Sequence, residues 1–229
     1  MPKTKTVLIA LAAVAAPALV HAQGVSPLDR DLARYEVTVT NITRGQQFTP
    51  ILAVSHRDPV RLFRLGAPAS PELQTLAEEG NTAPFVQLLA SNRAVTEVLP
   101  GQGLTNPGAS FTFVIEGRPA GDRLSIAAML IPTNDTFVAL NAVDLPESGK
   151  EERHFANAYD SGTEVNDELC ASIPGPFFVE CKGSGGGARV GGGEGYVYVG
   201  NGIHGVGDFV AASRDWNNPV ALVRIRRIR

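Results

Sequence analysis

The chain has 229 residues, and its 20 Lys and Arg against 23 Asp and Glu give a formal charge of −3. Binding to nucleic acid depends on clustered positive charge, so we expect no nucleic-acid partner for this mildly acidic chain. The length suits one domain with a full core, and 44% of the residues are hydrophobic.

The N-terminus has the pattern of a secretory signal peptide. Lys3 and Lys5 form a basic start, residues 7–20 form an apolar run, and residues 20–22 (Val-His-Ala) offer a small-residue cleavage site. The apolar run is short for a membrane span, and Pro17 interrupts it. An uncleaved membrane anchor is the alternative interpretation of this segment.

This leader predicts export. We expect residues 1–22 to be removed, the mature protein to begin at Gln23, and residues 23–229 to form a single domain. No later segment is apolar over the length that a bilayer requires, so we expect no transmembrane segment. The mature protein is therefore predicted to be secreted, either to the periplasm or to the extracellular space.

Short strands separated by turn residues dominate the rest of the chain. Residues 35–40 alternate polar and apolar side chains and are rich in β-branched residues, as half-buried strands are. Residues 51–55 are mostly apolar, which predicts a strand buried on both faces. Glycine and proline mark turns between further predicted strands over residues 94–99, 110–116, 123–130, 136–141, 152–158, 196–199 and 220–228.

Two short helices are predicted within residues 70–92. Ser70 is a suitable N-cap for the first helix and Gly80 can end it, while Thr82 would cap the second. Inward positions are predicted for Leu73, Leu76, Phe85, Leu88 and Leu89, and surface positions for Glu72, Glu78 and Glu79. The whole pattern predicts an all-β fold, an antiparallel β-sandwich of about eight strands, with this helical insertion near residues 70–92 covering one end of a sheet.

The two cysteines of the chain are Cys170 and Cys181. Export places them in an oxidising compartment, and an even number favours pairing, so we expect a disulfide between them. A metal site that uses both cysteines is the alternative. No histidine lies beside them at a zinc-ligand spacing, and we therefore favour the disulfide.

Motifs for catalysis are weak in this sequence. The histidines of the mature chain, His56, His154 and His204, are far apart, and no Gly-x-Ser-x-Gly motif surrounds a serine. The glycines of residues 191–195 lack the Lys and Ser or Thr of a phosphate-binding loop. We predict a protein that is not an enzyme; the alternative is a secreted hydrolase with a metal- or carboxylate-based site.

Residues 160–168, with the sequence Asp-Ser-Gly-Thr-Glu-Val-Asn-Asp-Glu, crowd oxygen-bearing side chains into one loop. Calcium takes roughly six to eight oxygen ligands from carboxylates, carbonyls and water. Acids four residues apart around Gly162 can turn toward one point, although the spacing is not that of an EF-hand. Residues 132–135 (Pro-Thr-Asn-Asp) lie at a predicted turn and could add ligands. A calcium site and a solvated acidic turn both fit this pattern.

Several ordered segments resemble the spondin N-terminal domain family. Residues 129–140 (MLIPTNDTFVAL) resemble a turn and strand that reads close to PTNDAFVAL in bacterial members. Residues 158–164 (AYDSGTE) resemble the YDAGTE segment of the family. The resemblance extends over nearly all of the mature chain and includes residues 35–41, 48–52, 202–208 and 216–221.

This resemblance implies an antiparallel β-sandwich similar to C2 folds, with a bound Ca²⁺. Carried over by matched position, the calcium ligands are Asp135, Asp160 and Glu164. The family more often has Asp where Glu164 stands, which affects the denticity of that ligand. Animal members are extracellular adhesion modules without a known enzymatic activity. The resemblance therefore implies a calcium-binding interaction module whose partner is a protein or glycan at the cell surface.

Overall fold

The computed structural model describes residues 32–175, 178–183, 186–187 and 191–228. The leader predicted over residues 1–22 lies outside these ranges. Contacts within the chain gather Asp31–Arg229 into one compact unit, to which all of the described residues belong. Within the described ranges, no helix has the length and apolar character that crossing a membrane would require.

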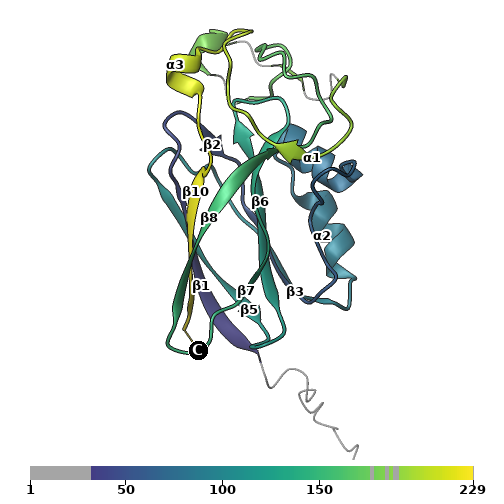
Figure 1. Ribbon diagram of the computed structural model, residues 1–229, viewed down its shortest axis with the longest axis vertical. Coiled ribbons are helices and arrows are strands. Elements are labelled where there is room, and N and C mark those ends of the chain that lie inside the picture. Colours follow the sequence, from purple (N-terminus) through teal and green to yellow (C-terminus); the bar gives the residue numbers. More distant parts are fainter. Residues whose placement is uncertain (1–31, 176–177, 184–185, 188–190, 229) are drawn as a thin grey trace, which may run out of the picture. The chain divides into compact units, whose positions relative to one another are not determined.

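Ten strands form one antiparallel sheet in the order β4-β3-β6-β7-β8-β10-β1-β5, with β2 paired to β6 and β9 paired to β8 (Figure 1). This arrangement confirms the predicted antiparallel β fold. The eight long strands are β1 (Ala33–Asn41), β3 (Leu52–His56), β4 (Val95–Pro100), β5 (Ser110–Gly117), β6 (Arg123–Ile131), β7 (Thr136–Asp144), β8 (Glu151–Asp160) and β10 (Ala221–Arg227). Of the two short strands, β9 (Tyr198–Val199) lies within the strand predicted over residues 196–199, whereas β2 (Gln47–Phe48) was not predicted.

The sheet curls until its edge strands, β4 and β5, lie close to each other. Side chains join this seam: the Ser55 hydroxyl donates to the carbonyl oxygen of Glu116 at 2.5 Å. The backbone N–H of Glu116 in turn donates to Oε2 of Glu97 at 2.5 Å. These bonds satisfy backbone groups that an open edge would leave to solvent, so the fold is intermediate between a sandwich and a closed barrel.

The main core lies inside the curled sheet. In β1 the alternation predicted from the sequence is observed, because Tyr35, Val37 and Val39 are fully buried and Glu36 and Thr38 are not. The same cluster takes side chains from every long strand of the sheet. Burial of apolar side chains at about 25 cal/mol per Å² makes this interior the main source of stability.

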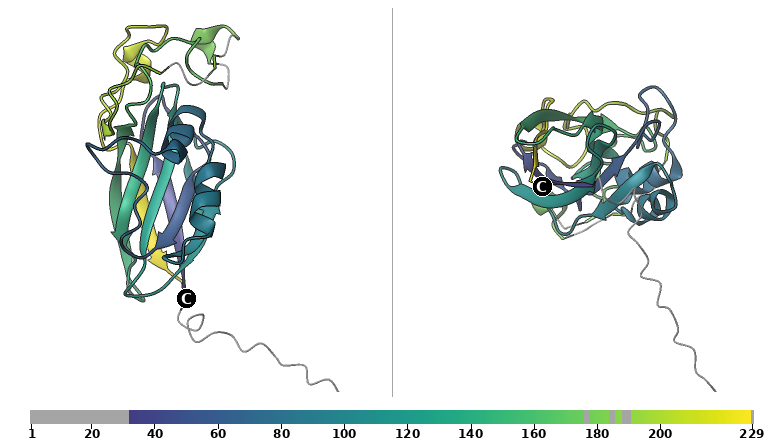
Figure 2. Two further views of the ribbon diagram at one scale, coloured as in Figure 1. Left: turned by 90° about the vertical axis from the view of Figure 1, so that its right-hand side faces the viewer. Right: turned by 90° about the horizontal axis from the view of Figure 1, so that it is seen from below.

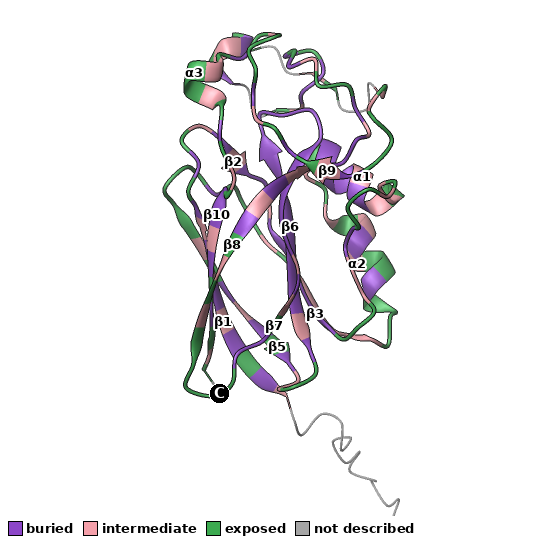
Figure 3. Cartoon of the chain, viewed as in Figure 1, coloured by how far each residue is buried: buried purple, intermediate pink, exposed green. Residues whose placement is uncertain are grey.

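Two helices cover the outer face of the sheet at β3, β6 and β7 (Figures 1 and 2). They are α1 (Pro71–Glu79) and α2 (Ala83–Ala90). Leu73, Leu76 and Phe85 pack with Leu52 and Phe137 in a second apolar cluster. This cover explains why all five residues of β3 are buried, as the sequence predicted (Figure 3).

The helix ends and faces follow the predictions in part. The Ser70 hydroxyl accepts the N–H of Leu73 at 3.2 Å, and Gly80 ends α1 in the left-handed conformation. Thr82 stands at the N-cap of α2 but makes no capping hydrogen bond with its side chain. Instead, Oδ1 of Asn81 accepts the N–H of Ala83 at 3.0 Å.

Two of the predicted helix positions were wrong. Leu88 is 52% exposed, because the short helix α2 turns only Phe85 and Leu89 fully toward the sheet. Glu78 is fully buried and accepts a hydrogen bond from Nε2 of Gln74 at 2.8 Å. The buried face of α1 therefore includes more residues than the two leucines that the sequence pattern identified.

Long connections after β8 form a cap over one end of the sheet, at the top of Figure 1. The cap includes a 3-10 turn (Val179–Cys181) and the short helix α3 (Ala211–Arg214). The predicted disulfide between Cys170 and Cys181 is confirmed, with their Cα atoms 5.5 Å apart. Arg214 adds a bidentate ion pair with Glu180 at 2.8 and 2.9 Å. A crosslink and an ion pair thus stabilise a region with little regular structure.

The two helix caps allow a matched test of capping. We expect Ser70→Ala to lower the free energy of unfolding by about 1 kcal/mol, because the N–H of Leu73 loses its acceptor. The melting temperature should then fall by roughly 2–4 °C in thermal unfolding. Thr82→Ala is the control and should melt with the wild type, since Thr82 makes no capping bond. Equal losses in both variants would contradict this assignment.

Candidate functional site

The acidic residues singled out in the sequence meet at the capped end of the sheet. Asp135 ends the turn between β6 and β7, and Asp160 is the last residue of β8. Cross-strand pairing of Thr136 with Asp160 brings these two segments together. The N–H of Ser161 then donates to the carbonyl oxygen of Asp135 at 3.2 Å. The register of β7 and β8 therefore places the predicted turn and the predicted acidic loop side by side.

Asp135 anchors the loop that follows β8. It is completely buried, and its Oδ2 accepts the backbone N–H groups of Thr163 at 2.8 Å and Glu164 at 3.0 Å. The hydroxyls of Ser161 and Thr163 donate to the same oxygen at 2.9 and 3.2 Å. Burial raises the pKa of Asp135, and these hydrogen bonds oppose the shift. Its other oxygen, Oδ1, is buried and has no hydrogen-bond partner among the described residues.

Asp160 is buried beside Asp135. Its Oδ1 accepts the N–H of Gly162 at 2.8 Å, and its Oδ2 accepts Nδ2 of Asn166 at 2.9 Å. The hydroxyl of Tyr198 also hydrogen-bonds with this carboxyl group. Burial raises the pKa of Asp160 to about 7, and the charge of Asp135 adds to the shift. Neither carboxyl group forms an ion pair in the described part of the chain.

The loop between Asp160 and Glu164 requires glycine at position 162. Gly162 has a φ of +68°, and a Cβ there would lie 2.2 Å from the carbonyl oxygen of Tyr196. Glu164 follows with its side chain fully buried and pairs through its backbone with Gly192. The glycine-rich segment thus packs against the acidic loop, and its described part lacks the side chains that would prevent this close approach.

Glu168 is a further buried acid that the sequence placed in the loop but did not single out. Its two carboxylate oxygens accept the backbone N–H groups of His204 at 2.6 Å, Gly205 at 2.7 Å and Val206 at 3.0 Å. The carboxylate therefore holds residues 204–206 against the acidic loop. The glycines around His204, at positions 202, 205 and 207, were the signal in the sequence that could have predicted this contact. A glycine-rich turn can point successive N–H groups at one anion.

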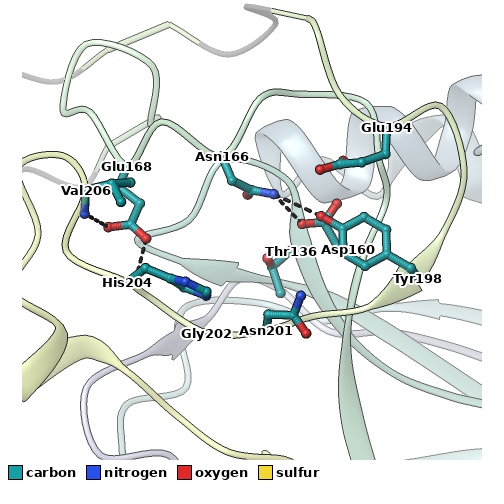
Figure 4. Close-up of a pocket in the computed structure, with 10 residues that line it drawn as sticks. All are labelled: Thr136, Asp160, Asn166, Glu168, Glu194, Tyr198, Asn201, Gly202, His204 and Val206. Atoms are coloured by element: carbon teal, nitrogen blue, oxygen red, sulfur yellow. Dashed lines mark hydrogen bonds between the residues drawn. The ribbon is translucent and has the colours of Figure 1, made fainter.

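A cavity of about 240 Å³ opens between the acidic loop and residues 194–206. Figure 4 shows Asp160, Asn166 and Tyr198 on one side, linked by hydrogen bonds, and Glu168 and His204 on the other. The side chains of Asp135 and Glu164 do not line it. The three predicted calcium ligands are therefore close in the fold, but only Asp160 faces this cavity.

The geometry around these acids bears on metal binding. Among the described residues, no group of three or more His, Cys, Asp or Glu side chains is arranged so that it could hold a metal ion. Both oxygens of Asp160 already accept hydrogen bonds, whereas Oδ1 of Asp135 has no partner within the described ranges. A cation here would use that oxygen and would replace at least one hydrogen bond to Asp160. Carbonyl, hydroxyl and water oxygens would complete its coordination.

The histidines do not form a shared site. His56 is fully buried, and its Nε2 hydrogen-bonds with the Ser125 hydroxyl at 2.8 Å. His154 lies 3.3 Å from the carboxylate of Glu152 on β8, away from the cavity. His204 alone lines the cavity. His56 is therefore a structural residue, because a substrate could not reach it without unfolding of the core.

The chain belongs to the spondin N-terminal domain family. The family model described as Spondin_N matches residues 39–166, more than half of the chain and most of the sheet. Membership in this family indicates an extracellular, non-catalytic module. The disulfide is compatible with that class. No curated protein matches the chain.

Asp135 offers a direct test of the anchor. We expect Asp135→Ala to lower the free energy of unfolding by about 2–5 kcal/mol, because two buried N–H groups lose their acceptor. Thermal unfolding in chelator would show this as a loss of roughly 5–15 °C. Asp144→Ala is the control, since the Asp144 carboxylate is 78% exposed. If both variants melt at the same temperature as the wild type, Asp135 does not anchor the loop that follows β8.

The pKa of Asp160 predicts a pH dependence in chelator. A pKa raised from 3.8 in the unfolded chain to about 7 in the folded protein means that the folded state binds the proton more tightly. The resulting stability is complete below pH 4 and disappears as the pH rises through about 7. Asp160→Asn cannot titrate, so the melting temperature of the wild type relative to this variant should fall from pH 5 to pH 8. A constant difference would contradict the shift.

Proposed function

We propose that this chain is a secreted, non-catalytic interaction module whose capped end is stabilised by Ca²⁺. The observation that carries the calcium proposal is the burial of Asp135 and Asp160 side by side without an ion pair in the described part of the chain. Two like charges in a poorly solvated site repel each other, and a divalent cation relieves that repulsion. Oδ1 of Asp135, which has no hydrogen-bond partner among the described residues, fits such an ion.

Asp135 and Asp160 would supply carboxylates of this site, and Glu164, the third ligand expected by matched position, would have to reorient its side chain to join them, because no three such side chains converge among the described residues. Each is buried, and they come from two segments that β7 and β8 bring together. Bound calcium would supply a positive charge that ties the turn before β7 to the loop after β8. Its part in this proposal is structural, since it would fix the loops that border the cavity.

The leader over residues 1–22 and the disulfide support secretion. The family supports a partner at the cell surface, either a protein or a glycan. The alternative of a secreted hydrolase is favoured by one feature, the raised pKa of Asp160 at the wall of a cavity. It needs Glu164 in the same cavity, however, and Glu164 is buried outside it. A binding module is the better-supported function.

The calcium proposal predicts a concentration-dependent gain in stability. With free Ca²⁺ at one hundred times its dissociation constant, the free energy of unfolding should rise by about 2.7 kcal/mol. The melting temperature should rise by roughly 5–10 °C relative to protein in chelator. Mg²⁺ should have a smaller effect, because it requires a tighter octahedral geometry and loses water reluctantly. Differential scanning calorimetry measures all three conditions.

Two variants make this measurement specific. Asp160→Asn should lose most of the calcium-dependent gain, because it removes one of the buried charges. Glu72→Gln is the matched control and should keep the full gain, since Glu72 lies in the first turn of α1. If the wild type and Asp160→Asn melt together at every calcium concentration, the acidic loop is a buried structural turn and the calcium proposal fails.

A further inference from the structure

The cavity in Figure 4 has a composition that defines the chemistry of a ligand. Among the described residues, its lining includes Asp160, Glu168 and Glu194 but no Lys or Arg. An anionic ligand would therefore meet repulsion without a compensating charge. The lining is otherwise dominated by amide, hydroxyl and ring groups.

Two of the carboxylates are already compensated by fixed donors. Glu168 accepts three backbone N–H groups, and Asp160 accepts one backbone N–H group and one amide. These bonds hold the two carboxylates in place. Two of the three carboxylates in the cavity wall are therefore held in fixed positions by hydrogen bonds.

Neutral hydrogen-bonding groups line the cavity beside these carboxylates. Thr136 is only 4% exposed and lines the cavity, where its hydroxyl can donate and accept hydrogen bonds. Asn201 is exposed, and Asn166 and Asn201 both line the cavity, where their amide groups can donate and accept hydrogen bonds. A buried hydroxyl that both donates and accepts, close to two amides, matches a ligand whose own groups do the same.

Aromatic and apolar surface lies beside these polar groups. Tyr198 lines the cavity, and the ring of Tyr196 lies 5.8 Å from it at an interplanar angle of 55°. Tyr196 is 46% exposed, and Val206 at the cavity wall is 71% exposed. Such surface can pack against the C–H groups of a sugar ring, while the amides and carboxylates bind its hydroxyls.

We propose that this cavity binds a neutral saccharide, the terminal sugar of an uncharged glycan. Thr136 and Asn201 would contact its hydroxyl groups, and Glu194 would accept a hydrogen bond at the rim. Sugar hydroxyls that donate to carboxylates form charge-assisted bonds, which are stronger than those between neutral groups. The inference rests on the proposed role as an interaction module and specifies the partner of its capped end.

The test uses the folded chain with methyl glucoside, methyl galactoside and methyl mannoside as neutral probes. Glucosamine and glucuronate serve as the cationic and anionic comparators. Ligand-observed NMR detects binding, and isothermal titration calorimetry gives the dissociation constants, each in calcium and in chelator. We expect at least one neutral glycoside to bind more tightly than both charged sugars.

Three variants locate the binding. Thr136→Val keeps the shape of the side chain but removes its hydroxyl, and Asn201→Ala removes an exposed amide. Each should weaken the glycoside at least tenfold, which corresponds to about 1.4 kcal/mol. Asn157→Ala is the matched control: Asn157 is half-buried on β8 outside the cavity lining, and its variant should bind within twofold of the wild type. Melting curves verify that all three variants fold.

The outcomes separate this inference from the calcium proposal. If no neutral glycoside binds, if only glucosamine binds, or if Thr136→Val and Asn201→Ala bind as well as the wild type, the saccharide site is refuted. A normal calcium-dependent gain in melting temperature would then leave the calcium proposal standing. If a glycoside binds as expected but calcium does not raise the melting temperature, the saccharide site stands and the calcium proposal fails.

Discussion

The arrangement of the capped end depends on the carboxylate of Asp135. This one buried group accepts two backbone N–H groups and two hydroxyls from residues 161–164, which lie on the far side of β8 in the sequence. Without it, those N–H groups would be buried without an acceptor, at a free-energy cost of about 1–3 kcal/mol each. The loop therefore has one favourable position, and that position places Asp160 at the cavity wall.

Glu168, at the end of the same acidic loop, has a similar anchoring role. It accepts three successive N–H groups from residues 204–206, and so fixes a segment that has no regular secondary structure. The disulfide and the Arg214–Glu180 ion pair stabilise the rest of the cap. A region of irregular backbone can border a binding cavity only when its polar groups are satisfied in this way. The buried acids thus act first as acceptors for backbone groups, and any ligand or cation at this end must be compatible with those bonds.

The sheet provides the rigid base for this cap. Its curling brings β5 close to β3 and β4, which contact it through the side chains of Ser55 and Glu97, and α1 and α2 cover the outer face of β3, β6 and β7. Because β7 and β8 are central strands, the residues at their ends, Asp135 and Asp160, are held by the register of the whole sheet. Functional groups in loops are thereby positioned by the most stable part of the domain.

The sequence by itself determined the helices α1 and α2, the pairing of the cysteines, the crowding of acids near residue 160 and every strand of the sheet except β2. Alternating burial in β1, the Ser70 cap and the Gly80 helix end are local patterns, so they can be recognised without knowing the fold. Local pattern also produced the wrong predictions for Leu88 and Glu78, because the face that a short helix buries depends on the surface beneath it. Only the tertiary structure decided which N–H groups reach Asp135 and Glu168, that Glu164 lies outside the cavity, and that Thr136 and Asn201 lie within it. These contacts join segments about 30 to 65 residues apart, and chain separation of that kind leaves no periodic signal in the sequence.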